Sequence, residues 1–186
     1  MLKLLRLLLL VVCVNLFAFG NAAGGYGSQY LSMTTEELAA LSDDELYEAL
    51  IFRTEEAVWH FDDVQTGFRA LNESQKVFYA VSNLEMEVNN GGLCQFFANS
   101  SQVCAPFVLQ ALERIGAEEH QKLLDDFVTK YGIDLNDLSS FETDSVEEFL
   151  ELYERYPFDE YDYAFYALEP LQQPLVAFAR AHLADF

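Results

Sequence analysis

Basic residues are scarce in this chain. Its 186 residues include 10 Lys and Arg against 31 Asp and Glu, which gives a formal net charge of −21. A protein that binds nucleic acid directly needs a basic surface, because it must displace cations from the phosphates. The shortage of basic residues therefore excludes direct binding to nucleic acid and disfavours anionic membrane surfaces. It favours basic proteins and cations as partners.

Recognised catalytic and cofactor motifs are also missing. The chain has no G-x-S-x-G, P-loop or G-x-G-x-x-G sequence, and its histidines, His60, His120 and His182, lack metal-ligand spacing. The segment 134–139 begins like an EF-hand loop but lacks a required ligand and the glycine. We therefore predict no cofactor, no metal site and a non-catalytic role. Weak Ca²⁺ association of the clustered acids stays open as an alternative.

Acidic residues are absent from the first 35 positions, which carry the pattern of a signal peptide. Two basic residues precede an apolar run of 13 residues, Leu7 to Phe19, and small residues follow it. The run is shorter than the roughly 18–20 residues that span a bilayer, which argues against the alternative of an anchor. We predict a signal peptide over 1–22, export to the periplasm or extracellular space, and no membrane segment after cleavage. The Gly- and Ser-rich residues 23–33 are predicted as a flexible leader.

Cysteine is rare as well, and signal cleavage would leave only Cys94 and Cys104. An even number of cysteines in an oxidising compartment is typical of disulfides. The two residues stand ten positions apart, so a bond between them would close a small loop. Two buried free thiols are the equal alternative. The spacing excludes a catalytic C-x-x-C pair.

Strand patterns are sparse, whereas helical patterns run through the chain. Capping boxes begin at Thr34 and Ser42, where a hydroxyl is followed three residues later by an acid. Asn72 opens a helix with apolar residues at helical spacing, which the Asn-Asn-Gly-Gly sequence ends. Further helices are predicted at about 93–99, 106–115, 117–130, 144–156 and 170–185. The sequence predicts an all-α fold, a compact single domain of six to eight helices, with N-terminal helices over 34–70 and the main helical domain over 71–186.

The most distinctive polar segment lies between residues 85 and 101. It combines a helix end, a double glycine, and a short helix with polar residues four apart on one face. The turn chemistry of Asn and Gly alone explains a structural corner here. The alternative is a polar pocket lined by Glu85, Asn89, Asn90, Gln95 and Asn99.

This polar segment also carries a resemblance to a known family. The chain from about Leu71 to Phe186 resembles the bacterial DNA-mimic-protein-nineteen-like domain. The residues that carry the resemblance are Asn89-Asn90-Gly91-Gly92, Gln95-Phe96-Phe97, Asn99-Ser100 and the segments 106–116 and 162–168. The resemblance implies an all-helical fold. For some members it also implies an acidic surface that imitates duplex DNA and occupies a DNA-binding protein, and it implies no catalytic residues.

Acidic residues are densest between positions 134 and 162. On the helix predicted over 144–156, Glu147, Glu151 and Glu154 share one face, about 5–6 Å apart, a spacing comparable with that of phosphates along a strand. The residues predicted on the buried face are Val146, Phe149, Leu150 and Tyr153. The residues predicted to bind a basic protein partner are Glu147, Glu148, Glu151, Glu154, Asp159 and Asp162. A solvated face that only keeps the protein soluble is the alternative.

These patterns predict an exported, non-catalytic acidic protein that binds a basic protein partner, for example an immunity-type protein that blocks a basic secreted toxin or nuclease. The second hypothesis is an envelope small-ligand binder or hydrolase that uses the corner at Glu85, Asn89, Gln95 and Asn99. The third is cation buffering by the clustered acids. Export bears on DNA mimicry, because an exported chain does not share a compartment with repressors. The oligomeric state stays open, a homodimer included.

Overall fold

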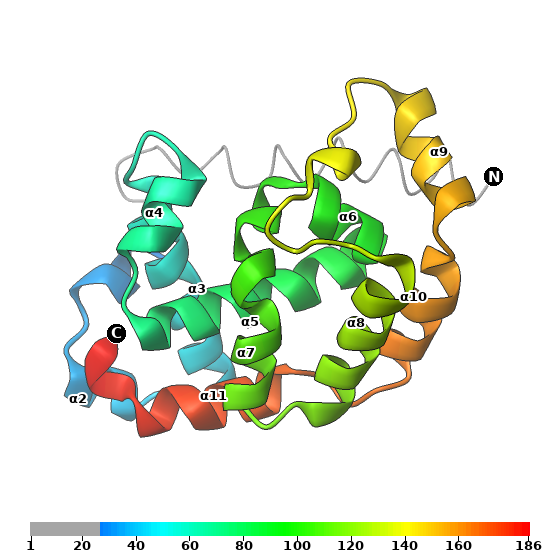
Figure 1. Cartoon of the computed structure of the whole chain (residues 1–186). Coiled ribbons are helices and arrows are strands. Elements are labelled where there is room, and N and C mark those ends of the chain that lie inside the picture. Colours follow the sequence, from blue (N-terminus) through cyan, green and yellow to red (C-terminus); the bar gives the residue numbers. More distant parts are fainter. Residues whose placement is uncertain (1–26) are drawn as a thin grey trace.

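The computed structural model describes residues 27–186, and this part of the chain is built of helices (Figure 1). It contains ten α-helices and four short 3-10 helices, with no strand among the described residues. Eight of the α-helices have seven or more residues. The all-α prediction is confirmed. The predicted signal peptide over 1–22 lies outside the described residues.

The chain enters the fold through a 3-10 helix, Ser28–Ser32, whose Tyr30 is buried beside the ring of Phe52. Part of the segment predicted as a flexible leader is therefore packed against the helices. The prediction missed it because Gly and Ser suggested mobility, while a single tyrosine supplies the apolar contact. Gly27 adopts a φ of 89° and lies against Phe52, a close approach that leaves no room for a side chain.

Three helices follow in the N-terminal region: α2 (Thr35–Ala39), α3 (Asp43–Trp59) and α4 (Val64–Ala70). Both predicted capping boxes are present. Thr34 and Ser42 each accept a hydrogen bond from the amide three residues on, and the glutamate there reaches back. The caps fix where α2 and α3 begin, which is why the sequence placed these helices correctly.

The central helix is α5 (Glu73–Gly91), which crosses the middle of the molecule (Figure 1). Thirteen of its 19 residues are buried, so it faces other elements on nearly every side. Around it pack α3, α6 (Leu93–Ala98), α7 (Ala105–Arg114) and α11 (Gln172–Ala181). A helix buried all round must enclose its polar residues too, and these form the corner described below.

The C-terminal half adds α8 (Glu118–Tyr131), α9 (Val146–Arg155) and α10 (Phe158–Tyr166). Phe127 of α8 lies at the centre of an aromatic cluster, stacked on Phe97 and in contact with Phe158 and Tyr161. This cluster joins α6, α8 and α10. The helix α9 lies at the outer edge of the molecule, at the upper right of Figure 1. Within residues 27–186, no helix combines the length and the apolar character needed to span a bilayer.

Candidate functional site

The helix α9 presents most of the predicted acidic face. Ser145 caps its first turn by accepting the Glu148 amide at 3.2 Å, and Phe149 and Leu152 are buried against the rest of the domain. Val146 was predicted on the buried face but is 44% exposed. That part of the prediction is wrong. Val146 is the first residue of α9, outside the part of the helix where Phe149 and Leu152 pack against the domain.

The carboxylates of α9 point to solvent. The exposed acidic residues here are Glu147, Glu148, Glu151 and Glu154 of α9 and Asp159 in the first turn of α10. Glu148 accepts the backbone amide of Asp144 at 2.7 Å, so it also stabilises the loop before the helix. Glu147, Glu151 and Glu154 make no hydrogen bond or ion pair to any residue between 27 and 186. These three side chains are therefore available to a partner.

Asp162 does not belong to this acidic face. It is 1% exposed, and its carboxylate accepts the backbone amide of Leu93 at 2.8 Å, at the start of α6. Gly92, at a φ of 84°, lies so close that an added Cβ would collide with the Asp162 carboxylate. The sequence counted Asp162 as a surface acid because the density of charge says nothing about which side of α10 an acid faces.

The predicted corner pocket is not formed by the five residues assigned to it. Glu85 accepts the backbone amide of Leu171 at 2.6 Å, on the side of α5 that faces α11. Burial raises the pKa of Glu85, against the lowering effect of this hydrogen bond. Asn89 and Asn90 are exposed at the end of α5. Glu85 and the two asparagines therefore make no hydrogen bond to Gln95 or Asn99.

The residue that gathers the polar side chains is Glu87, which the sequence analysis missed. Its carboxylate accepts hydrogen bonds from Gln95, from Asn99 at 2.9 Å and from Ser101 at 2.9 Å. Glu87 is 7% exposed. A helix turns about 200° over two residues, so Glu85 and Glu87 project to opposite sides of α5. The two-residue spacing in the sequence therefore indicates that only one of these glutamates can contact Gln95 and Asn99.

The Glu87 network holds α6 and the 3-10 helix Ser100–Cys104 against α5. All its members except Asn99 are buried, and each partner donates to the carboxylate. Satisfied buried networks of this kind rigidify a core. The arrangement supports the structural reading of the corner, in which the double glycine turns the chain and the polar side chains satisfy one another.

Cys94 and Cys104 are both free, buried thiols, so the structure has the second of the two alternatives and no disulfide. Burial raises the pKa of Cys94, and nearby Asp162 raises it further. Burial likewise raises the pKa of Cys104, with a contribution from Glu55. Both thiols are therefore protonated at neutral pH and unsuited to nucleophilic or metal chemistry. Among residues 27–186, no group of three His, Cys, Asp or Glu side chains could hold a metal ion.

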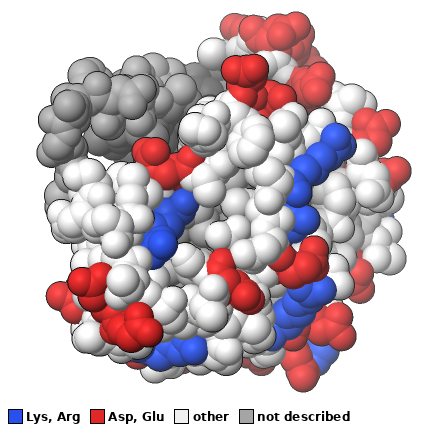
Figure 2. Space-filling model, turned by 90° about the vertical axis from the view of Figure 1, so that its left-hand side faces the viewer, with Lys and Arg blue, Asp and Glu red and all other residues white. Residues whose placement is uncertain are grey.

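Charge is distributed differently on the opposite side of the molecule. Figure 2 shows the face at the left of Figure 1, where carboxylates form separate groups with Lys and Arg side chains among them. Elsewhere in the described residues, ion pairs such as Arg180 with Asp43 at 2.6 Å and Arg114 with Glu73 at 3.1 Å neutralise part of the acidic charge. The face in Figure 2 is therefore a mixed surface rather than a continuous acidic one.

Comparison with known proteins gives one match. The family model described as DMP19-like protein matches residues 69–182, which is more than half of the chain. The matched region runs from the end of α4 to the end of α11 and includes the corner, α9 and the aromatic cluster. No curated protein and no solved structure matches the chain.

Proposed function

We propose that this chain, which belongs to the DMP19-like protein family, is an acidic helical protein that binds a basic protein partner through α9. We call the binding surface the α9 carboxylate face and define it as Glu147, Glu148, Glu151, Glu154 and Asp159. Export through a signal peptide and a non-catalytic role are parts of the same proposal. The observation that carries it is the row of exposed carboxylates on α9, of which Glu147, Glu151 and Glu154 make no hydrogen bond or ion pair with any residue between 27 and 186.

Three physical features favour this surface over the other acidic groups. Glu147, Glu151 and Glu154 need not break an existing ion pair within residues 27–186 before they meet Arg or Lys side chains, which lowers the cost of binding. The α9 carboxylate face lies at the edge of the molecule (Figure 1). Its helix is anchored by Phe149 and Leu152, so the carboxylates are presented in a fixed arrangement. Clustered charge of one sign also steers an oppositely charged partner and speeds association.

The test begins with a partner captured by the purified protein from its own compartment and then purified itself. Its dissociation constant is measured for the wild-type protein and for the triple variant Glu147→Gln, Glu151→Gln, Glu154→Gln. Loss of three charge-assisted contacts should weaken binding by about tenfold or more. The plot of log affinity against log salt concentration should also become less steep for the variant.

The matched control removes the same charge elsewhere, through Glu36→Gln, Glu56→Gln and Glu113→Gln. These three glutamates are exposed on α2, α3 and α7, away from α9. The control should change the affinity by no more than about threefold, because it alters only the long-range field. Equal losses for both triple variants would sink the proposal, since binding would then depend on net charge alone.

A ligand-binding or hydrolytic function at the corner has no observation in its favour. The polar side chains of Gln95, Asn99 and Ser101 are engaged by Glu87, and Glu85 is engaged by the amide of Leu171. Hydrogen bonds among the residues themselves support a structural role for the corner.

A further inference from the structure

A second acidic region surrounds a cavity far from α9. The cavity has a volume of about 620 Å³ and lies where the N-termini of α3, α8 and α11 meet. This volume falls within the roughly 300–1,000 Å³ typical of pockets that bind small molecules. The titratable residues that line it are Asp43, Asp44, Glu118, Glu119, His120 and Glu169.

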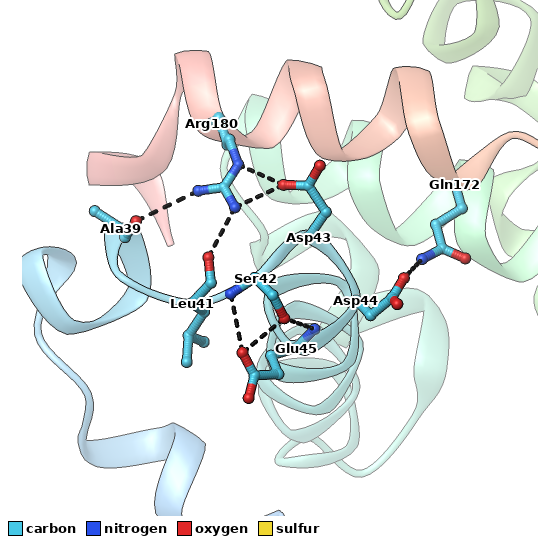
Figure 3. A network of polar contacts seen from close by, with 8 residues as sticks. All are labelled: Ala39, Leu41, Ser42, Asp43, Asp44, Glu45, Gln172 and Arg180. Atoms are coloured by element: carbon cyan, nitrogen blue, oxygen red, sulfur yellow. Dashed lines mark hydrogen bonds and ion pairs between the residues drawn. The ribbon is translucent and has the colours of Figure 1, made fainter.

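Some of these carboxylates are already used to hold the fold together. Arg180 of α11 donates through Nε and Nη2 to Asp43 Oδ1, at 2.8 and 2.6 Å, and Nη2 also reaches the carbonyl of Leu41 (Figure 3). Gln172 donates to Asp44 at 2.8 Å (Figure 3). These contacts hold α11 against the start of α3, and Arg180 neutralises Asp43 while Asp44 keeps its negative charge.

The cavity lining also includes carboxylates without a partner. Glu119 and Glu169 make no hydrogen bond or ion pair with any residue of the described range 27–186. Glu118 pairs with Lys122 at 3.4 Å on the exposed surface. Each helix N-terminus adds about half a positive charge, which the five carboxylates still outweigh after the two basic residues are counted. The cavity is therefore negative on the side of Glu119 and Glu169.

His120 gives an independent sign that the cavity receives a ligand. It is only 7% exposed and lines the cavity. Its ring makes an edge-to-face contact with the ring of Phe165, and the two centroids are 4.9 Å apart. Its imidazole makes no hydrogen bond within residues 27–186. Burial lowers the pKa of His120, although Glu119 acts to raise it. A neutral imidazole offers one unused acceptor nitrogen to a donor in the cavity.

The residues that line the cavity favour an organic cation over a metal ion. Among the described residues no three ligating side chains come close enough to hold a metal ion, so the carboxylates surround the cavity rather than converge on a point. Pro170, Pro174 and Val176 supply an apolar wall beside them. Such a wall suits an alkyl stem. A planar cation with several N–H donors can reach carboxylates that lie on different sides of the cavity.

We propose that this cavity binds a guanidinium group on an alkyl stem, with its N–H groups directed at Glu119, Glu169 and the ring nitrogen of His120. The group can come from an arginine side chain of a protein or from a free alkyl guanidine. The site is separate from the α9 carboxylate face, since α11 runs along the lower edge of Figure 1 and α9 lies at the upper right. It stands or falls independently of the function proposed above.

The test is calorimetric titration of the purified protein with three probes. They are the peptide acetyl-Gly-Arg-Gly-amide, the small guanidine agmatine, and the same peptide with neutral citrulline in place of arginine. We expect saturable binding of a guanidinium probe. The citrulline peptide should bind about tenfold or more weakly than the arginine peptide, because it loses a charge-assisted contact. Tighter binding of the peptide points to a protein source, and tighter binding of agmatine points to a free ligand.

Two variants locate the binding. The double variant Glu119→Gln, Glu169→Gln should bind the guanidinium probe about tenfold or more weakly than the wild-type protein, because both carboxylates lose their charge. Both side chains are exposed, so the variant should fold as the wild-type protein does. Glu36→Gln with Glu56→Gln makes the same charge change at exposed residues outside the cavity lining and outside the α9 carboxylate face, and should leave the affinity within about twofold. No saturable binding of either guanidinium probe, or equal losses in the two double variants, would overturn the proposal.

Discussion

At the scale of single residues, the direction in which a carboxylate projects decides its role. Glu85 and Glu87 are two positions apart on α5, and they serve different contacts. Asp159 and Asp162 are three apart on α10, yet the first is exposed and the second is buried. The sequence located these acids but not their surroundings, because the partners of Glu87 and Asp162 lie on other helices.

Replacing Glu87 should be costly. The change Glu87→Ala leaves the side chains of Gln95, Asn99 and Ser101 without their acceptor, and buried unsatisfied groups are expensive. We expect the free energy of unfolding to fall by roughly 2–4 kcal/mol in urea denaturation. The exposed Asn90 of the same helix is the control, and Asn90→Ala should change stability by less than about 0.5 kcal/mol. Equal effects of the two changes would contradict the network.

Glu85 should give stability a particular pH dependence. Burial raises its pKa above the ordinary value of 4.5, so the folded protein holds this proton more tightly than the unfolded chain. The contribution of Glu85 to stability is therefore present at low pH and is lost as pH rises from about 4.5 through the raised pKa. In Glu85→Gln this loss is removed. We therefore expect the difference in unfolding free energy, variant minus wild type, to grow as pH rises from about 4.5 to about 7. A difference that stays constant over this range would contradict the raised pKa of Glu85.

At the scale of elements, helix starts could be predicted and helix surroundings could not. The capping boxes at Thr34 and Ser42, the Asn72 cap and the glycine after α5 are local signals, and the helices begin and end where these signals lie. Exposure of Val146 and the packing of Ser28–Ser32 depend on contacts between distant segments. Local chemistry cannot specify such contacts, so these parts of the prediction were wrong.

The helices α5 and α9 should differ in local stability. Thirteen residues of α5 are buried, whereas α9 buries Phe149 and Leu152. Segments with few buried apolar contacts open without global unfolding. In hydrogen exchange of the native protein, we expect protection factors in α9 to be about tenfold or more below those in α5. Equal protection of the two helices would show that α9 is held by the core, and its placement at the edge of the fold would need another explanation.

At the scale of the whole molecule, the charge imbalance limits stability. With 10 basic residues for 31 acidic ones, most carboxylates cannot have a cationic partner. Salt should therefore stabilise the protein by screening repulsion among them. Raising the ionic strength from about 0.01 M to about 0.15 M shortens the screening length from about 30 Å to about 8 Å. We expect Tm to rise by about 2–5 °C over this range, and a fall in Tm would mean that attractive ion pairs dominate.

The global character of the protein was predictable to a useful degree. The helical fold and the family followed from caps, periodicity and the Asn-Asn-Gly-Gly segment, and both are confirmed. The cavity at the N-termini of α3, α8 and α11 could not be foreseen, because its walls come from three segments that are distant in the sequence. His120 belongs to no sequence motif. Its burial beside the unpaired carboxylates of the cavity is what suggests a role in binding.

The most direct measurement of the central claim is site-specific photo-cross-linking from α9. Val146 is exposed beside the α9 carboxylate face, so a benzophenone amino acid can replace it without disturbing Phe149 or Leu152. The same amino acid in place of Glu113, exposed on α7, serves as the reference position. The account predicts that position 146 cross-links the captured partner within a segment rich in Arg and Lys, and that position 113 does not. Cross-links from position 113 alone would contradict binding through α9.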